Sequence, residues 1–223
     1  MKIALYGEPS FSHVTVDLEP GEDIVAESGA MQSMSAELDM KAAPNGNFFS
    51  ALGKRLFGGE SFFVSRFTNN SDKTRTLTIS QDVPGQIIAM ELDDGKEITL
   101  QRGAYLAHVG EISLKASWAG FVSWISGEGL VHLKAKSTGK GTLFFGAYGA
   151  ILERRVQGGL KVDDGHLVAY DPDLQLKLAM SGGLFSTIFG GEGLVTRVVG
   201  DGQIYVQSRS VKGLAAWLNP KFR

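Results

Sequence analysis

The stretch SGGLFSTIFGGE, residues 181–192, places four large apolar side chains between two pairs of glycines. It has two relatives in the chain, SALGKRLFGGE at 50–60 and SWAGFVSWISGE at 117–128. Each begins with serine, passes through a short apolar segment that contains glycine, and ends in Gly-Glu. The final glutamates, Glu60, Glu128 and Glu192, lie 68 and 64 residues apart.

A turn that contains glycine recurs upstream of each stretch. It reads LEPGEDIVAESGA at 18–30, LDDGKEITLQRGA at 92–104 and VDDGHLVAYDPDL at 162–174. Its glycines Gly21, Gly95 and Gly165 lie 74 and 70 residues apart. Two markers that recur in the same order predict three internal repeats, at approximately 12–80, 86–150 and 156–210.

A strand-like run follows each Gly-Glu and predicts a β-hairpin in each repeat. SFFVSRF (61–67), GLVHLKA (129–135) and GLVTRVV (193–199) each meet a polar or glycine-rich turn. TRTLTIS (74–80), TLFFGAY (142–148) and QIYVQSR (203–209) then return. Hairpin units cannot bury their apolar faces alone. We therefore expect one all-β domain over 1–223, in which three repeated β-hairpin units pack around a shared core with pseudo-threefold symmetry.

One short helix is predicted at the C-terminus, over approximately 210–219. Ser210 is placed to cap it, apolar residues follow at helical spacing, and Pro220 ends it. We expect Trp217 to anchor this helix to the sheet.

Composition narrows the class of protein. Glycine is frequent, with 29 residues against 6 prolines, which is typical of many strands joined by tight turns. The chain has no cysteine, and its net charge of −2 provides no field that would attract nucleic acid or anionic lipid. No apolar run is long enough to span a bilayer, and the N-terminal residues do not resemble a signal peptide. These features predict a cytoplasmic protein.

Several segments resemble one known family over essentially the whole chain. They are GFVSWISGEGL (120–130), GAYGAILERRV (146–156) and SRSVKGLAAWLNP (208–220), and they resemble the altered-inheritance-of-mitochondria protein 24 family. The resemblance implies an all-β fold of the tryptophan RNA-binding attenuator protein-like (TRAP-like) superfamily, of the β-sandwich or double-stranded β-helix type, and implies no catalytic residues. The first ten residues contain Glu8 and a single basic residue, Lys2, so the chain resembles the prokaryotic branch and a mitochondrial role is not carried over.

No catalytic constellation is visible, and we expect no enzyme, no cofactor and no metal. The four histidines are scattered, and His132 lies in an alternating strand, where a surface or hydrogen-bonded histidine is expected. The Asp-Asp pairs at 93–94 and 163–164 precede glycine, which is ordinary turn chemistry. The repeat-related Glu60, Glu128 and Glu192 could converge on a cation, but we expect each to accept backbone N–H groups within its own loop.

The remaining signal is the set of apolar loops. Three interpretations compete: they close the open end of the β-core, they form an interface for self-association or a protein partner, or they make shallow membrane contact. We expect a non-enzymatic structural or interaction protein that forms a homo-oligomer. The alternative is a small-molecule or metal-binding β-domain with a site between repeats, and RNA binding or peripheral membrane contact ranks lower. The expected surface comprises Leu52, Leu56, Phe57, Phe121, Trp124, Ile125, Leu184, Phe185, Ile188 and Phe189.

Overall fold

The described part of the chain forms two antiparallel sheets and one short helix, which confirms the predicted all-β class. The computed structural model describes residues 1–44, 63–101, 103–118, 131–163, 165–180 and 194–221. The elements are β1 (Lys2–Tyr6), β2 (His13–Leu18), β3 (Asp23–Glu27), β4 (Met31–Met34), β5 (Asp39–Pro44), β6 (Phe63–Thr68), β7 (Arg75–Ser80), β8 (Ile87–Leu92), β9 (Glu97–Leu100), β10 (Tyr105–Trp118), β11 (Val131–Gly146), β12 (Ile151–Asp163), β13 (Leu167–Tyr170), β14 (Gln175–Met180), β15 (Leu194–Gln207), α4 (Val211–Leu218) and the 3-10 turn η2 (Asn219–Lys221).

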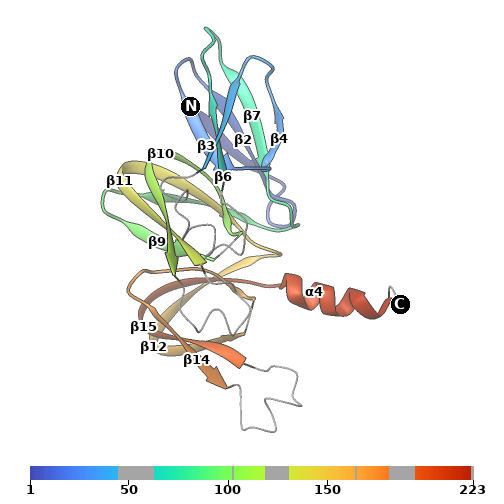
Figure 1. The fold of residues 1–223 in the computed structure, drawn as a ribbon, viewed down its shortest axis with the longest axis vertical. Coiled ribbons are helices and arrows are strands. Elements are labelled where there is room, and N and C mark those ends of the chain that lie inside the picture. The colour runs from blue at the N-terminus through green and yellow to red at the C-terminus, as the bar shows by residue number, and fades with distance from the viewer. Residues whose placement is uncertain (45–62, 102, 119–130, 164, 181–193, 222–223) are drawn as a thin grey trace.

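The two sheets differ greatly in size. The smaller sheet has four strands in the order β1-β2-β7-β4. The larger has eleven, with the path β12-β15-β13-β9-β11-β10-β3-β6-β5, to which β14 adds by pairing with β15 and β8 by pairing with β11. Strands from the first part of the chain lie at the top of Figure 1, those from the middle part below them, and β12, β14 and β15 at the bottom.

The predicted hairpins are wrong in all three places. The first pair of runs falls on β6 and β7, which belong to different sheets. The second and third pairs each lie within one continuous strand, β11 and β15. The expected turns at 137–141 and 200–202 are bends inside these strands rather than reversals of the chain. β12 pairs continuously past 200–202, and β10 pairs on both sides of 138–140 across a register shift.

Glycine serves close approach at these bends rather than reversal of the chain. Gly110 lies opposite Gly141 in the ladder between β10 and β11. A Cβ added to Gly141 would lie 2.7 Å from the Val109 carbonyl oxygen. Gly110 has φ +77°, a left-handed conformation that side chains with a Cβ rarely adopt. The glycines that predicted a turn are therefore explained by the close approach of the β10 and β11 backbones.

The same set of strand pairings occurs three times. We call β6 with β7, β11, and β15 the three central strands. The first part of each central strand pairs with two strands. β6 pairs with β3 and β5. The beginning of β11 pairs with β9 and the end of β10, and the beginning of β15 pairs with β14 and the end of β12. The second part of each central strand pairs with two other strands. β7 pairs with β2 and β4. The end of β11 pairs with β8 and the start of β10, and the end of β15 pairs with β13 and the start of β12. The repeated pairing does not by itself define a threefold axis, so the expected pseudo-threefold symmetry stays a prediction.

This pairing corrects one marker of the repeat. Gly21 and Gly95 each lead into the strand that pairs with the first part of a central strand, β3 or β9. The third strand of this kind is the 158–163 part of β12, which begins at Gly158. Gly165 instead lies between β12 and β13, the place that Gly29 and Gly103 hold earlier in the chain. All six glycines have positive φ, so similar residues at different turns misled the alignment by letter.

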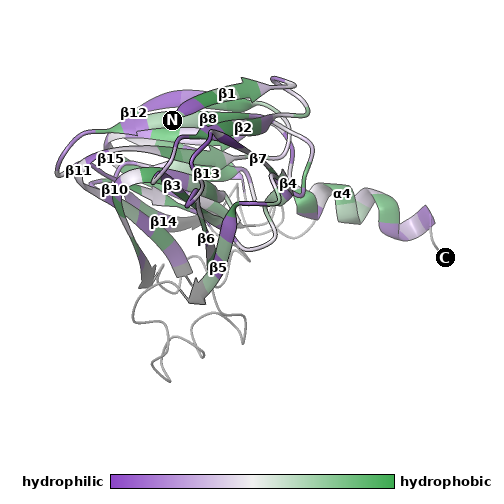
Figure 2. Ribbon diagram, turned by 90° about the horizontal axis from the view of Figure 1, so that it is seen from above, coloured by the Kyte–Doolittle hydropathy of each residue, from purple (hydrophilic) through white to green (hydrophobic). Residues whose placement is uncertain are grey.

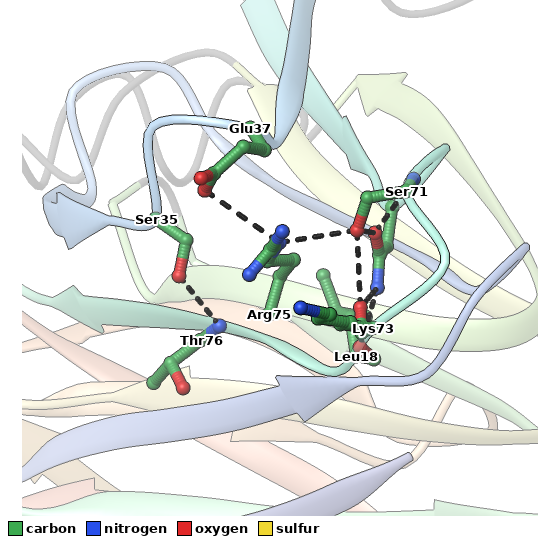
Figure 3. Close-up of polar contacts among 8 residues, drawn as sticks. Leu18, Ser35, Glu37, Ser71, Lys73, Arg75 and Thr76 are labelled. Carbon is green, nitrogen blue, oxygen red and sulfur yellow. Dashed lines mark hydrogen bonds and ion pairs between the residues drawn. The ribbon is translucent and has the colours of Figure 1, made fainter.

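A buried asparagine connects the two sheets where β6 leads into β7. The Asn69 side chain is fully buried, and its amide nitrogen donates to the carbonyl oxygens of Leu18 and Lys73, at 2.7 and 2.8 Å. Its oxygen accepts from the Ser71 N–H and hydroxyl, at 3.0 and 2.7 Å. Figure 3 shows how Arg75 extends this network, donating to the Ser71 hydroxyl and lying 3.5 Å from the Glu37 carboxylate. The side chain thus satisfies the backbone groups that the crossing leaves without ladder partners.

The apolar core falls into three clusters that follow the chain. The first is centred on the small sheet and includes Val14, Val16, Leu77 and Ile79. The second lies under the middle strands and the third under β12, β13 and β15. Burial therefore supports one continuous β-domain made of three neighbouring parts.

Candidate functional site

The apolar surface expected from the sequence lies outside the described residues. All ten of its residues fall within 45–62, 119–130 or 181–193, as do Glu60, Glu128 and Glu192. The structure describes the strand ends that bracket these segments. They are joined as Pro44 opposite Phe63, Trp118 opposite Val131, and Met180 opposite Leu194. Each segment thus connects a flanking strand to the start of a central strand, at the same place in the pairing pattern.

Apolar side chains are exposed next to the first of these segments. Phe63 is 45% exposed at the start of β6, and Met40 is 49% exposed on β5, which pairs with it. In Figure 2 β5 and β6 descend from the sheets toward the lower side of the view. This side of the molecule therefore presents apolar surface to solvent.

The helix α4 carries the largest exposed apolar side chain of the C-terminal region. Ser210 caps it as predicted, because its hydroxyl accepts from the Gly213 N–H at 3.0 Å. No residue of α4 is buried, and Figure 1 shows the helix projecting away from the sheets. Val211, Leu214 and Trp217 are 54%, 38% and 62% exposed.

The predicted anchoring role of Trp217 is wrong. Its ring lies under the Lys221 ammonium, 4.5 Å from the ring centroid, rather than against a strand. The helical spacing identified the helix but could not tell whether its apolar stripe faces this chain or something else. An apolar helix with no buried residue is a surface that another molecule can cover.

A cleft of about 370 Å³ lies where the three parts of the chain meet. The lining comes from the turn at 27–30 before β4, the 103–106 segment and the start of β13, together with Val211 of α4. The lining mixes backbone, small side chains and a few polar groups such as Gln81 and Gln207. The cleft lies between the parts of the chain that the sequence predicted as repeats, where the alternative hypothesis put a ligand.

Two buried histidine–tyrosine pairs link neighbouring parts of the fold. The Tyr105 hydroxyl donates to the Val25 carbonyl oxygen at 3.1 Å and lies 2.8 Å from His108 Nδ1. His132 Nδ1 lies 2.7 Å from the Tyr170 hydroxyl and so joins β11 to β13. The expectation of a hydrogen-bonded His132 is confirmed. Tyr105 and His108 lie three residues apart on the same strand, β10. The bond from Tyr105 to Val25 and the pair of His132 with Tyr170 join residues 80 and 38 positions apart, which come together only through strand pairing.

Burial keeps both histidines neutral. It lowers the pKa of His132 from 6.5 to about 4. Burial likewise lowers the pKa of His108 to about 4, and the nearby positive charge of Arg66 acts in the same direction. Burial raises the pKa of the Tyr105 phenol well above its usual value. A neutral imidazole and a neutral phenol, both enclosed, form a structural link between strands.

The described carboxylates offer little for a metal ion. Among the residues that the structure describes, no three histidine, aspartate or glutamate side chains come together as a metal site would require. The Asp93 carbonyl accepts from the Lys96 N–H at 3.1 Å, and that of Asp163 accepts from the His166 N–H at 3.2 Å, so both residues serve turns as expected. In the described part of the chain no helix has the length and apolar character that crossing a membrane requires.

Comparison with known proteins places this architecture. The chain is 28% identical over 226 residues to an uncharacterized protein of Streptococcus pyogenes serotype M6, covering 98% of this chain and 90% of that protein. It also matches the crystal structure of a Streptococcus pyogenes protein, with a TM-score of 0.76, 27% identity and 99% of each chain covered. The model of the family described as mitochondrial biogenesis AIM24 matches residues 3–209. This chain therefore belongs to the mitochondrial biogenesis AIM24 family.

Proposed function

We propose that this protein is a non-enzymatic structural protein that associates with further copies of itself through exposed apolar surface, as a homo-oligomer. The observation that carries the proposal is α4, an apolar helix that projects from the sheets with no residue buried. Leaving Val211, Leu214 and Trp217 in water forgoes burial worth roughly 1.5–3 kcal/mol for each large side chain. A second protein surface recovers that free energy.

The surface chemistry supports protein as the partner. The net charge of −2 gives no general attraction to nucleic acid or to an anionic membrane. The exposed apolar groups, together with Met40 and Phe63, match the Met- and aromatic-rich composition of protein interfaces. The ten apolar residues of the three segments between strands belong to the same proposal, and a cytoplasmic location remains part of it.

The test compares solution mass by light scattering for the unmodified protein and for Leu214→Ser/Trp217→Ser. We expect the unmodified protein to be an oligomer and the variant to have a lower mass with an unchanged circular dichroism spectrum. Ala216→Ser is the matched control, since it makes the same kind of change on the same helix without removing a large apolar group. An oligomer that survives the double change would remove α4 from the interface. RNA or lipid retained by the monomer would favour the lower-ranked alternatives.

The cleft between the three parts favours one second candidate, a small-molecule-binding β-domain. Its volume of about 370 Å³ lies within the range of small-molecule sites. Native mass spectrometry of the purified protein tests this candidate. A bound mass that disappears in Ser28→Trp, which fills the cleft, would support ligand binding, and the absence of any bound mass would count against it.

A further inference from the structure

Two junctions inside the chain are built from the same pair of strand edges. We call β3, β9 and the 158–163 part of β12 the outgoing strands, and β4, the 105–109 part of β10 and β13 the incoming strands. The outgoing strand β3 pairs with β10, with Ala26 opposite Ala107 and Val25 opposite His108. The outgoing strand β9 pairs with β13, with Leu100 opposite Ala169 and Thr99 opposite Tyr170. Both junctions are antiparallel and join one part of the chain to the next.

The third outgoing strand and the first incoming strand have no such junction. Within the described ranges, β12 pairs with β15 alone and β4 pairs with β7 alone. β12 ends the eleven-stranded sheet and β4 ends the four-stranded sheet. β12 lies in the lower part of Figure 1 and β4 in the upper part, so this chain does not bring them together. Each end of the molecule therefore presents one half of a junction.

The outgoing edges correspond residue by residue. Val25, Thr99 and Leu160 lie opposite Arg66, Lys134 and Val198 of the central strands. Those three central residues each follow a closing glutamate of the repeated stretch by six positions. Leu160 therefore holds the place in β12 that Val25 and Thr99 hold at the internal junctions.

The incoming edges correspond in the same way. The pairing with a central strand shifts register between Met31 and Ser33 in β4, between Tyr105 and Ala107 in β10, and between Leu167 and Ala169 in β13. After that shift the next residues are Met34, His108 and Tyr170. Ser33 and Met34 thus hold the places that pair with an outgoing strand at the internal junctions.

Burial marks the two ends as incomplete. Val25 is 7% exposed and Thr99 2%, whereas Leu160 is 36% exposed. His108 and Tyr170 are buried, whereas Met34 is half-buried and its neighbour Met31 is 39% exposed. Covering the ends as the internal junctions are covered would bury these apolar side chains.

The β12 edge also contains an uncharged stretch that is open to pairing. Natural sheets protect edge strands with charged side chains that discourage another strand from adding. Glu153, Arg154 and Arg155 provide charge on the first half of β12, and Lys161 and Asp163 provide charge near its end, whereas Gln157-Gly158-Gly159-Leu160 between them carries none. The four residues of β4, Met31–Met34, are uncharged as well.

We propose that β12 of one copy of this chain pairs antiparallel with β4 of another, with Leu160 opposite Met34 and Lys161 opposite Ser33. The contact repeats the internal junction and extends the eleven-stranded sheet of one copy into the four-stranded sheet of the next. Because it joins two different edges, it is heterologous and propagates from copy to copy, closing only if the copies return to the start. It specifies the self-association of the proposed function and rests on it.

Disulfide trapping tests the register, because the natural chain has no cysteine. Ser33→Cys and Lys161→Cys are made as separate variants, one with a longer tag, and mixed under mild oxidation. Directly opposed residues of antiparallel strands have Cα atoms about 4.5–5.5 Å apart, within the range a disulfide spans. We expect a mixed dimer on a non-reducing gel. Gln157→Cys mixed with Ser33→Cys is the matched control, since it lies four positions out of register on the same strand.

The outcomes separate this inference from the proposed function. A mixed dimer with Lys161→Cys but not with Gln157→Cys supports the junction. An oligomer by light scattering, with no preference between the two mixtures, overturns the junction and leaves self-association standing. A monomer of the unmodified protein at every concentration overturns both. Light scattering of the reduced variants, matching the unmodified protein, shows that the substitutions themselves leave the assembly intact.

Discussion

Acid should destabilise this fold through its two enclosed histidines. His108 and His132 each have a folded-state pKa of about 4 against an ordinary value of 6.5. Because the folded pKa is the lower one, the unfolded chain binds more protons below pH 6.5. Stability therefore falls as the pH drops through 6.5 and stops falling near pH 4.

The size of the effect follows from the two pKa values. A pKa difference of about 2.5 corresponds to about 3 kcal/mol for each histidine when protonation is complete. At pH 5 the loss reaches about 2 kcal/mol for each, or about 4 kcal/mol for both, relative to pH 7.5. Glu22, whose pKa is lowered from 4.5 chiefly by its hydrogen bond to the N-terminal amine, loses its contribution only below this window.

Urea unfolding at pH 7.5 and at pH 5 measures this difference. We expect the free energy of unfolding of the unmodified protein to drop by about 4 kcal/mol, that of His132→Gln by about 2 kcal/mol, and that of His108→Gln/His132→Gln by under about 1 kcal/mol. The single variant is the internal control, because it retains one titrating group. Equal stability of the unmodified protein at both pH values, or a full drop in the double variant, would refute the reasoning.

Three further predictions concern stability and association. Asn69→Ala should lower the free energy of unfolding by roughly 2–4 kcal/mol, because it strips partners from several enclosed backbone groups, and a loss under about 0.5 kcal/mol in a urea titration would contradict the role of Asn69. Gly110→Ala should cost more in thermal unfolding than Gly95→Ala, since both have φ +77° but only at Gly110 would a Cβ collide with a neighbouring backbone, at Lys140; equal costs would argue against close approach at the bend. Trp217→Ala should change the stability of the fold by less than about 0.5 kcal/mol while weakening association, and strong destabilisation of a dilute sample would show that the ring packs against its own chain.

The sequence predicted the class of the fold more reliably than its connections. Alternating apolar residues and frequent glycines indicated strands, and the capping Ser210 located α4. The prediction of a hairpin was wrong because Gly139 and Gly141, read along the sequence alone, have the spacing of a turn. Whether such residues reverse the chain depends on a partner strand alongside, and β10 could not be recognised as that partner from local pattern alone.

The candidate site divides in a similar way. The spacing of apolar residues in a sequence identifies apolar helix faces, yet it does not reveal what covers them, as the exposed Trp217 shows. The His132–Tyr170 link depends on contact between strands far apart in the chain, so no local spacing predicts it. The unequal exposure of Val25 and Leu160 likewise emerges only when the strand registers are known.

The most direct test of self-association is the light-scattering mass of the unmodified protein across a dilution series. A monomer has a mass of 23.9 kDa. We predict a mass that is a multiple of this value at high concentration and declines toward it on dilution. A mass of 23.9 kDa at every concentration would contradict the account.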